Sequence, residues 1–421
     1  MNLILVDVFK RFLNARQIKS EDFADRINSR YTVFILISFC ILVGSAQYVG
    51  HPITCWCPAE YTTAMVQYTN YVCWIANTYY VPSNTNLPNP NQPRQFIAYY
   101  QWVPIILIIM AILFYFPSIL WSLMLNNSNL NPKSILKLLQ SNEIFISTET
   151  HDKMIKNVAK LIDQALNLHF NQIYQKRSSS FLIRLKYKIS RIFLPKYQSG
   201  RYLTFLYIFI KLIYCVNVCS QFFLLNLFMG IDYNIYGFQV IRDLINGVNF
   251  WESPRFPRLT ICDFTVRSLG NNNNMFTIQC TLPINLFNEK IFIFIWFWLC
   301  FVAFITVYGI LFSIISFRAS SRMSFIKRYF NFKINNQNRQ YFLHNYLDNN
   351  LNHTYMNIDL PPSARNPELN LTTKRNKKLF KLFIFDYLKY DGILLLWIIK
   401  QNSNDIVVGE LIHLLWSHFN K

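Results

Sequence analysis

Charged residues are scarce in this 421-residue chain, where Asp, Glu, Lys and Arg together make up 15% of the total. Soluble domains typically carry about 25%, and hydrophobic residues reach 52% here, so the composition excludes an ordinary soluble protein. Acidic residues are scarcer than basic ones, and the formal net charge is +20. The chain nevertheless lacks zinc-finger spacing, a basic recognition helix and an RNA-binding signature. We therefore expect no nucleic-acid partner.

Catalytic and cofactor-binding motifs are also missing. The sequence has no Gly-x-Ser-x-Gly, no Gly-rich phosphate loop ending in Lys and no His-Glu-x-x-His. The string HPITCWC, which begins at His51, resembles part of a metal site but has no evident fourth ligand. The sequence therefore predicts neither an enzyme nor a resident metal or cofactor.

Four apolar runs are long enough to cross a bilayer, which takes roughly 20 residues. The predicted transmembrane helices are 31–49, 99–125, 202–229 and 291–317. The first is not a cleavable signal peptide, because a segment of mixed charge precedes it and its apolar run is of full length. The later run DGILLLWIIK is too short to span, and we expect it to pack with the following IVVGELIHLLW in a helical domain.

Lys and Arg are distributed unevenly between these spans. Segments 1–30, 126–201 and 318–421 hold 6, 13 and 15 of them, whereas segments 50–98 and 230–290 hold 1 and 5. Positive residues concentrate on the cytoplasmic side of a membrane protein. This predicts a cytoplasmic N-terminal segment, cytoplasmic loop and C-terminal domain, with both termini inside and two extracellular loops.

Cysteines and sequons agree with that topology. Four cysteines fall in the spans, and the other five all lie in the two outer loops: Cys55, Cys57, Cys73, Cys262 and Cys280. Disulfides form in oxidising compartments, so this distribution favours the same orientation. The Asn-x-Ser/Thr sequons lie only in predicted cytoplasmic segments, at Asn126, Asn352 and Asn370, and we expect none to be glycosylated.

The second outer loop predicts a β-hairpin in RLTICDFTVRSLGNNNNMFTIQCTL, with a turn at 270–274 that places Leu269 opposite Met275. Cys262 and Cys280 would then be diagonal, roughly 7 to 8 Å apart. A disulfide needs about 5.5 to 6 Å between Cα atoms. These two cysteines should therefore bond elsewhere, and the first loop offers partners.

The first outer loop predicts a short helix in PAEYTTAMVQYTNYV, starting near Pro58 and Glu60. One helical face would carry Tyr61, Met65, Tyr68 and Val72. Disulfides from Cys55 and Cys73 would join this helix to the hairpin in a small cap. Cys57 is the odd cysteine, and a free thiol, an intermolecular bond and a choice of partner all remain open.

The chain contains the motif YYQWVP and, along its length, the blocks DRINSRYT, QYVGHPITCW, NTYYVP, FYFPSILW, CDFTVR, LPINLFNEKIFIFIWFW and DYLKYDGILLLWIIKQNSNDIVVGELIHLLW. YYQWVP resembles the signature of the innexins, the invertebrate gap-junction proteins, and the other blocks resemble further innexin segments, most like those of the nematode members. The signature residues are Tyr99, Tyr100, Gln101, Trp102, Val103 and Pro104. The expected fold is an all-α membrane protein: a four-transmembrane-helix bundle with a small disulfide-stapled extracellular α/β cap and a helical cytoplasmic domain.

The resemblance implies a subunit of an octameric large-pore channel that passes ions and small solutes between adjacent cells. It would assemble with the same or other innexin subunits among membrane lipids of the plasma membrane and dock with an apposed hemichannel at a gap junction. The implied disulfides are Cys55–Cys280 and Cys73–Cys262, although Cys57 could replace Cys55. An undocked hemichannel is the alternative, and a four-span carrier or receptor is the alternative from another class. Carriers usually contain internal repeats, and we find none here.

Pore-lining residues are expected mainly from the resemblance. It implies that the N-terminal segment folds into the pore mouth, where Asn2, Leu5, Val8 and Phe9 would line the conduit. A membrane-surface anchor has the same amphipathic pattern. The third span contains four polar residues: Lys211, Asn217, Gln221 and Asn226. They could line a water path or form hydrogen bonds between helices. Lys211 could pair with an acidic residue or line an aqueous crevice. Pro104 and Pro117 are expected as structural kinks or as gating hinges.

Overall fold

The computed structural model describes residues 21–82, 87, 96–126, 131–140, 148–175, 200–230, 233–247, 255–267, 272–330 and 374–420. The chain divides into two compact units. Unit 1 comprises Met1–Asp22, Leu120–Ile210 and Ile310–Lys421, and unit 2 comprises Phe23–Ile119 and Lys211–Gly309.

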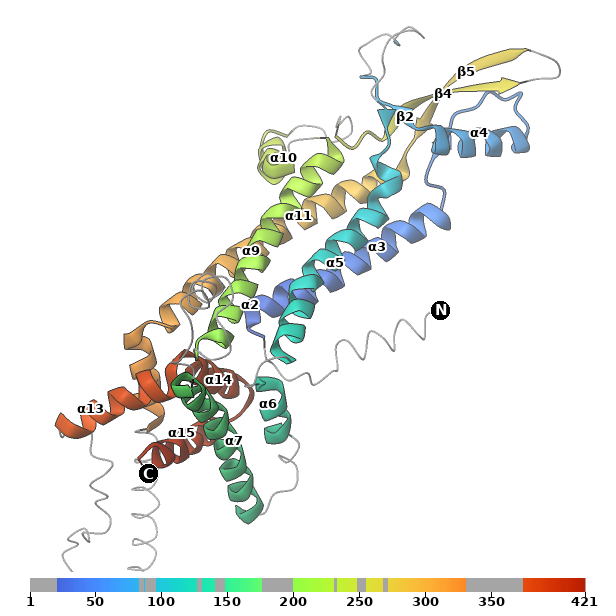
Figure 1. Cartoon of the computed structure of the whole chain (residues 1–421). Coiled ribbons are helices and arrows are strands. Elements are labelled where there is room, and N and C mark those ends of the chain that lie inside the picture. The colour runs from blue at the N-terminus through green and yellow to red at the C-terminus, as the bar shows by residue number, and fades with distance from the viewer. Residues whose placement is uncertain are drawn as a thin grey trace, which may run out of the picture. The chain divides into compact units, whose positions relative to one another are not determined.

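Four described helices are long and apolar enough to cross a membrane (Figure 1). The first runs from α2 (Phe23–Arg26) through a π-helical turn (Ile27–Thr32) into α3 (Val33–Tyr48). The others are α5 (Tyr99–Asn126), α9 (Tyr202–Met229) and α11 (Pro283–Ser316). Helix α11 begins before its most apolar stretch, because Pro283 fits the first helical position, where no N–H bond is lost. The predicted fold class, a four-span bundle with a small strand-containing disulfide region, is confirmed.

The spanning helices pack in unit 2 through fully buried aliphatic and aromatic side chains. Leu36 of α3, Phe114 of α5, Leu225 of α9 and Leu299 of α11 all belong to one core cluster. The outer faces of these helices are also apolar, and many large hydrophobic side chains on them are exposed in the single chain. The helices are therefore apolar all round, as membrane spans are.

A five-stranded antiparallel sheet forms the other part of unit 2. Its order is β1 (Thr54–Cys55), β5 (Asn273–Thr281), β4 (Leu259–Arg267), β2 (Thr78–Tyr79) and β3 (Phe96–Ile97). The first outer loop thus supplies three short strands around the long hairpin of the second. Helix α4 (Thr63–Ala76) lies against β4 (Figure 1). The second loop also forms a 3₁₀ turn (Tyr233–Ile235) and α10 (Tyr236–Ile245), which the sequence pattern did not predict.

The predicted hairpin register is wrong. Met275 lies opposite Thr265, not Leu269, so the strands are shifted by an even number of residues. Register is fixed by pairing with the first loop, where Cys55 lies opposite Cys280 and Tyr79 opposite Ile261, rather than by the tip. An even shift keeps each side chain on its face. Cys262 and Cys280 are therefore still not opposite each other.

The apolar face predicted for the first-loop helix is buried only in part, since Tyr61 and Val72 pack against the core. Helix α4 begins at Thr63, where the Thr62 side chain accepts a hydrogen bond from the Met65 N–H and caps the helix. Met65 and Tyr68 are exposed, whereas Thr69 and Cys73 are buried. The Cys73 disulfide turns the neighbouring face, which carries Thr69 and Cys73, toward the sheet, and this tertiary link overrides the apolar pattern.

The described part of unit 1 outside the spans is helical. It contains α6 (Pro132–Gln140), α7 (Thr148–Gln175), a helix at 319–330, α13 (Lys374–Leu382), a π-helical segment (Phe383–Leu388), α14 (Lys389–Asn402) and α15 (Asp405–Phe419). Helix α14 packs against α6 and α15, and α15 packs against α7. The short apolar run of α14 is buried by these neighbours, as predicted. Aromatic rings complete this core, with Phe383 against both Trp416 and Phe419.

The carboxylate of Asp391 in α14 holds the first turn of α9 within unit 1. It accepts hydrogen bonds from the N–H and the hydroxyl of Thr204, at 3.0 and 3.1 Å, and it is buried. Its own N–H donates to the Gly200 carbonyl. A negative charge here caps the free N–H groups at the helix start.

Candidate functional site

Two disulfides join the outer loops in unit 2. Cys55 of β1 bonds to Cys280 of β5, and Cys73 of α4 bonds to Cys262 of β4. This is the pairing that the innexin resemblance implies. Cys57 is free and partly buried. The cap therefore has its helix and its edge strand each tied to the hairpin.

The two disulfides lie next to each other. The sulfurs of Cys55, Cys73 and Cys280 all lie within 4.8 Å of one another. Reduced thiolates at such spacing can bind a metal, but sulfurs committed to disulfides do not provide thiolate ligands. The two adjacent disulfides therefore link the two outer loops covalently.

The first half of the YYQWVP motif connects the cap to the second span. The Tyr99 hydroxyl donates to the Arg255 carbonyl at 3.1 Å. The Tyr100 ring is buried and packs on Trp74 of α4, with 4.8 Å between ring centroids. The Tyr100 carbonyl accepts a hydrogen bond from the Gln47 side chain at the end of α3. These two tyrosines thereby tie both outer loops to the first and second spans.

The second half of the motif repeats this connection. The Gln101 amide donates to the Trp74 carbonyl, and Val103 is fully buried. The Pro104 carbonyl accepts from the Cys40 thiol. Because Pro104 has no N–H, the carbonyl left without its helical partner is that of Tyr100, and the Gln47 side chain of the first span pairs with it instead. Trp102 is the exception, since 54% of its side chain is exposed. Its position at the start of α5 is typical of an interfacial tryptophan.

The fourth span is connected to the cap by polar residues at its start. The Asn285 side chain donates to the Pro257 carbonyl at 2.8 Å. Arg258 forms an ion pair of 3.0 Å with Glu289, whose side chain is 3% exposed. Both contacts come from the block LPINLFNEK. The cap is thus anchored to the first, second and fourth spans.

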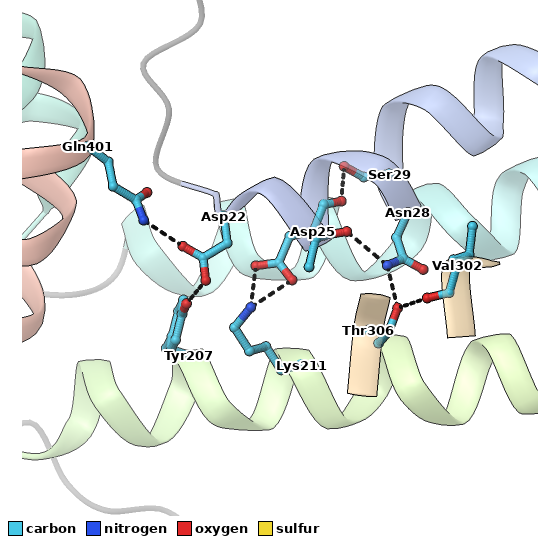
Figure 2. Close-up of polar contacts among 10 residues, drawn as sticks. Asp22, Asp25, Asn28, Ser29, Tyr207, Lys211, Val302, Thr306 and Gln401 are labelled. Carbon is cyan, nitrogen blue, oxygen red and sulfur yellow. Dashed lines mark hydrogen bonds and ion pairs between the residues drawn. The ribbon is translucent and has the colours of Figure 1, made fainter. Parts of the chain in front are cut away.

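A buried ion pair joins the first and third spans in unit 2. The Lys211 ammonium lies 3.1 and 3.2 Å from the two carboxylate oxygens of Asp25 (Figure 2). Both side chains are almost fully buried. The acidic partner for Lys211 that the sequence left open is therefore Asp25. Removing one partner of such a pair destabilises the folded protein by more than the intact pair stabilises it, because a charge is left buried.

Hydrogen bonds join the first and fourth spans beside this pair. The Asn28 amide donates to the Ala24 carbonyl and to the Thr306 hydroxyl at 2.8 Å, and Thr306 donates in turn to the Val302 carbonyl (Figure 2). One turn further on, the Trp298 indole donates to the Thr32 hydroxyl at 3.0 Å. Asn28 and Thr32 of the π-helical turn thus connect the first span to α11 through hydrogen bonds.

A separate contact occurs in unit 1, where Asp22 accepts hydrogen bonds from the Tyr207 hydroxyl and the Gln401 amide (Figure 2). It connects the segment before the first span to α9 and α14. Together with Asp391, it fixes the start of the third span to the C-terminal helices.

The amides of the third span make local contacts. The Gln221 amide donates to the Asn217 side chain, and the Asn226 side chain accepts from the Tyr233 N–H. These bonds favour the structural interpretation over a polar pore stripe. Asn2, Leu5, Val8 and Phe9 lie outside the described residues, so the pore-mouth assignment stays a prediction.

Asp25, Asn28, Thr306 and Glu289 were not identified as site residues from the sequence. Asp25, Asn28 and Glu289 lie in blocks that carry the innexin resemblance, DRINSRYT and LPINLFNEK. The available signal in the sequence was a polar residue next to an apolar run, because polar residues in a membrane span face protein rather than lipid. Thr306 gave no such signal, because threonine is common inside spans.

Known proteins are similar to this chain in sequence. The sequence pattern of the innexin family matches residues 21–419. Innexin unc-9 of Caenorhabditis elegans is 34% identical over 402 residues, which cover 95% of this chain and 92% of the relative. Innexin-19 of the same organism is 32% identical over 98% of the chain and 86% of the relative, and Innexin eat-5 is 32% identical over 94% and 86%. The described spans, the disulfide-joined outer loops and these matches lead to one conclusion: the chain belongs to the innexin family.

Proposed function

We propose that this protein is a subunit of a gap-junction channel that passes ions and small solutes between adjacent cells. The observation that carries this proposal is the family match over almost the whole chain, together with four candidate spans joined to one disulfide-bonded cap. The proposal involves no chemical step and no cofactor. Pore width and the charge near its narrow mouth would set selectivity.

The proposed topology has both termini and the α6–α15 helices in the cytoplasm and the cap outside. It is supported by the Lys and Arg excess in 126–201 and 318–421. Two disulfides join segments 50–98 and 230–290, which is consistent with an oxidising exterior on that side. The absence of sequons from 50–98 and 230–290 favours close apposition of two caps, because glycans there would obstruct docking.

The proposed assembly is a closed ring of eight subunits around a water-filled path, formed with the same or other innexins in the plasma membrane. Exposed apolar side chains on the spans provide surfaces for neighbouring subunits as well as for lipid. The segment before the first span would line the pore mouth through Asn2, Leu5, Val8 and Phe9. Images of purified particles down the pore axis test this directly, with eight-fold symmetry expected.

Dye transfer between paired cells tests the function. Both cells of a pair would express the chain in a communication-deficient line, and an inert dye too bulky for ordinary carriers would be injected into one. We expect transfer only when both cells express the chain. Dye uptake by single cells without transfer between pairs would select the undocked hemichannel, and neither transfer nor uptake would contradict the channel.

A further inference from the structure

A cavity of about 400 Å³ lies in unit 1 where α11 ends and the helix at 319–330 begins. Small-molecule sites commonly have volumes of roughly 300 to 1,000 Å³. Helices α9 and α14 complete its wall through Tyr207 and Trp397. It belongs neither to the cap nor to the polar contacts between the spans in unit 2.

The lining of this cavity is cationic and rich in hydroxyl groups. Among the described residues that line it there are three cations, Arg322, Arg328 and Lys400, and no carboxylate. Five serines also contribute: Ser313, Ser316, Ser320, Ser321 and Ser324. Guanidinium, ammonium and hydroxyl donors are the groups that proteins use to bind phosphate oxygens.

Arg322 is the most informative of these groups. Its side chain is 4% exposed, and its Nε atom is buried without a hydrogen-bond partner. The guanidinium is stacked on Tyr390, 4.0 Å from the ring centroid, which fixes its orientation. Burial lowers the pKa of Arg322 below its usual value, because desolvation disfavours the charged form. A buried cation with an unused donor is costly unless an anion compensates it.

Lys400 reaches the cavity from α14. Its ammonium lies 5.9 Å from the Phe325 ring centroid and 5.6 Å from that of Tyr329, and both rings line the cavity. The Tyr329 hydroxyl donates to Asp405, so this hydroxyl is already engaged. Arg328 is exposed on the helix at 319–330. The three cations therefore come from two separate elements to one cavity.

Aromatic rings also line the cavity. The Tyr207 ring packs edge-on against Phe317 and Trp397, with centroid distances of 6.1 and 6.2 Å. Such a wall suits an organic group attached to a phosphate better than a bare ion. The cavity thus combines donors for an anion with an apolar surface for its carrier.

We propose that this cavity binds a phosphomonoester carried on a small polar organic group. One source is the phosphorylated head group of a phosphoinositide lipid, because Ser313 and Ser316, in the last turn of the fourth candidate span, line the cavity. The other source is a soluble organic phosphate. The lipid source rests on the proposed topology, which places this end of α11 at the inner leaflet, whereas the soluble source does not.

The test uses the purified full chain with two probes. Soluble inositol trisphosphate is titrated by calorimetry against protein in phosphatidylcholine nanodiscs. Phosphatidylinositol bisphosphate is offered in mixed nanodiscs and detected by native mass spectrometry. Arg328→Gln and Lys400→Gln remove one cation each, and Arg322 is left intact because it is packed in the core. Lys327→Gln is the matched control, since Lys327 is exposed on the same helix but does not line the cavity.

We expect at least one probe to bind, and each cavity variant to bind about tenfold more weakly, which corresponds to the loss of one charge-assisted contact. Lys327→Gln should change binding less than about twofold. Binding of the lipid alone selects the membrane source, and binding of the soluble probe identifies a soluble ligand. No binding of either probe, or an equal loss in Lys327→Gln, overturns the proposal. Dye transfer is measured on the same variants, so failure here is distinguishable from failure of the channel function.

Discussion

The two units of the molecule are stabilised in different ways. All nine cysteines fall in unit 2, and the cap there is held by two disulfides around short strands. Unit 1 contains no cysteine, and its helices outside the spans bury a continuous aromatic and aliphatic core. Small domains with little core depend on covalent links, whereas larger helical domains can rely on burial. The proposed topology explains the difference, because only the outer cap would meet an oxidising environment.

The comparison also shows where polar residues are used. In the spans of unit 2, ion pairs and hydrogen bonds such as Asp25–Lys211 specify which helices meet. Lipid and a neighbouring helix are equally apolar, so apolar packing alone discriminates poorly between them. In unit 1, outside the membrane, water provides the driving force, and aromatic burial around Phe383 is sufficient.

The largest effect is expected from breaking a disulfide of the cap. Cys73→Ser removes the link between α4 and β4 and leaves Cys262 as a thiol close to the remaining disulfide. Such a loss costs up to about 5 kcal/mol. We expect junctional conductance between paired cells to be abolished. Cys57→Ser is the control, since Cys57 is free, and it should retain conductance. Equal loss in both variants would contradict the assigned pairing.

The corresponding change in unit 1 removes an aromatic ring from its core. Phe383→Ala deletes a fully buried side chain that contacts Trp416, Tyr387 and Phe419. We expect a loss of about 4 kcal/mol in stability. Hydrogen exchange should increase in α15 and remain unchanged in β4 and β5. Ile406→Ala, at an exposed position of α15, should have little effect. Faster exchange of the hairpin in Phe383→Ala would show that the two units are not stabilised independently.

The polar contacts between spans are tested by Asp25→Asn. Lys211 would remain buried without its counter-charge, at a cost of about 3 kcal/mol. Thermal unfolding of the purified protein in detergent should shift to lower temperature. The double variant with Lys211→Met should recover most of the loss, because no charge is then buried. Asp243→Asn, which removes a partly exposed carboxylate with partners 3.7 Å away, is the control. A double variant as unstable as the single one would exclude the ion pair as the cause.

The smallest effect concerns one hydrogen bond of the cap. The Tyr79 hydroxyl donates to the Asp263 carboxylate at 2.9 Å, joining β2 to β4. Tyr79→Phe should destabilise the cap by about 1.5 kcal/mol, since the acceptor is charged. Hydrogen exchange of β2 should increase while that of β5 is retained. The exposed Tyr68 offers a control, and Tyr68→Phe should be neutral. If both variants exchange alike, the bond has no net effect.

Features governed by length and composition could be predicted from the sequence. The spans follow from bilayer thickness, and the short run in α14 was excluded as a span for the same reason. The family resemblance, through its ordered motif blocks, implied the cysteine pairing that the structure contains. It did so through the order of the family's loop cysteines, which carries over to Cys55, Cys73, Cys262 and Cys280.

Features governed by tertiary contacts could not be predicted. The hairpin register depends on Cys55 lying opposite Cys280, and the orientation of α4 depends on its disulfide rather than on Met65 and Tyr68. Asp25 was missed as the partner of Lys211 because the two residues are far apart in sequence. The cavity beside Arg322 combines residues from three separate segments, none of which forms a recognisable motif.

The orientation of the cap is the claim on which the rest depends, and one measurement tests it directly. Asn274→Thr converts residues 272–274, which are exposed at the start of β5, into an Asn-x-Thr sequon. The natural sequons at Asn126, Asn352 and Asn370 are the internal control. We expect the variant expressed in cells to carry one glycan, seen as an electrophoretic shift removed by endoglycosidase, and the natural chain to carry none. Glycosylation of the natural chain, with no additional shift in Asn274→Thr, would place the cap in the cytosol and contradict the account.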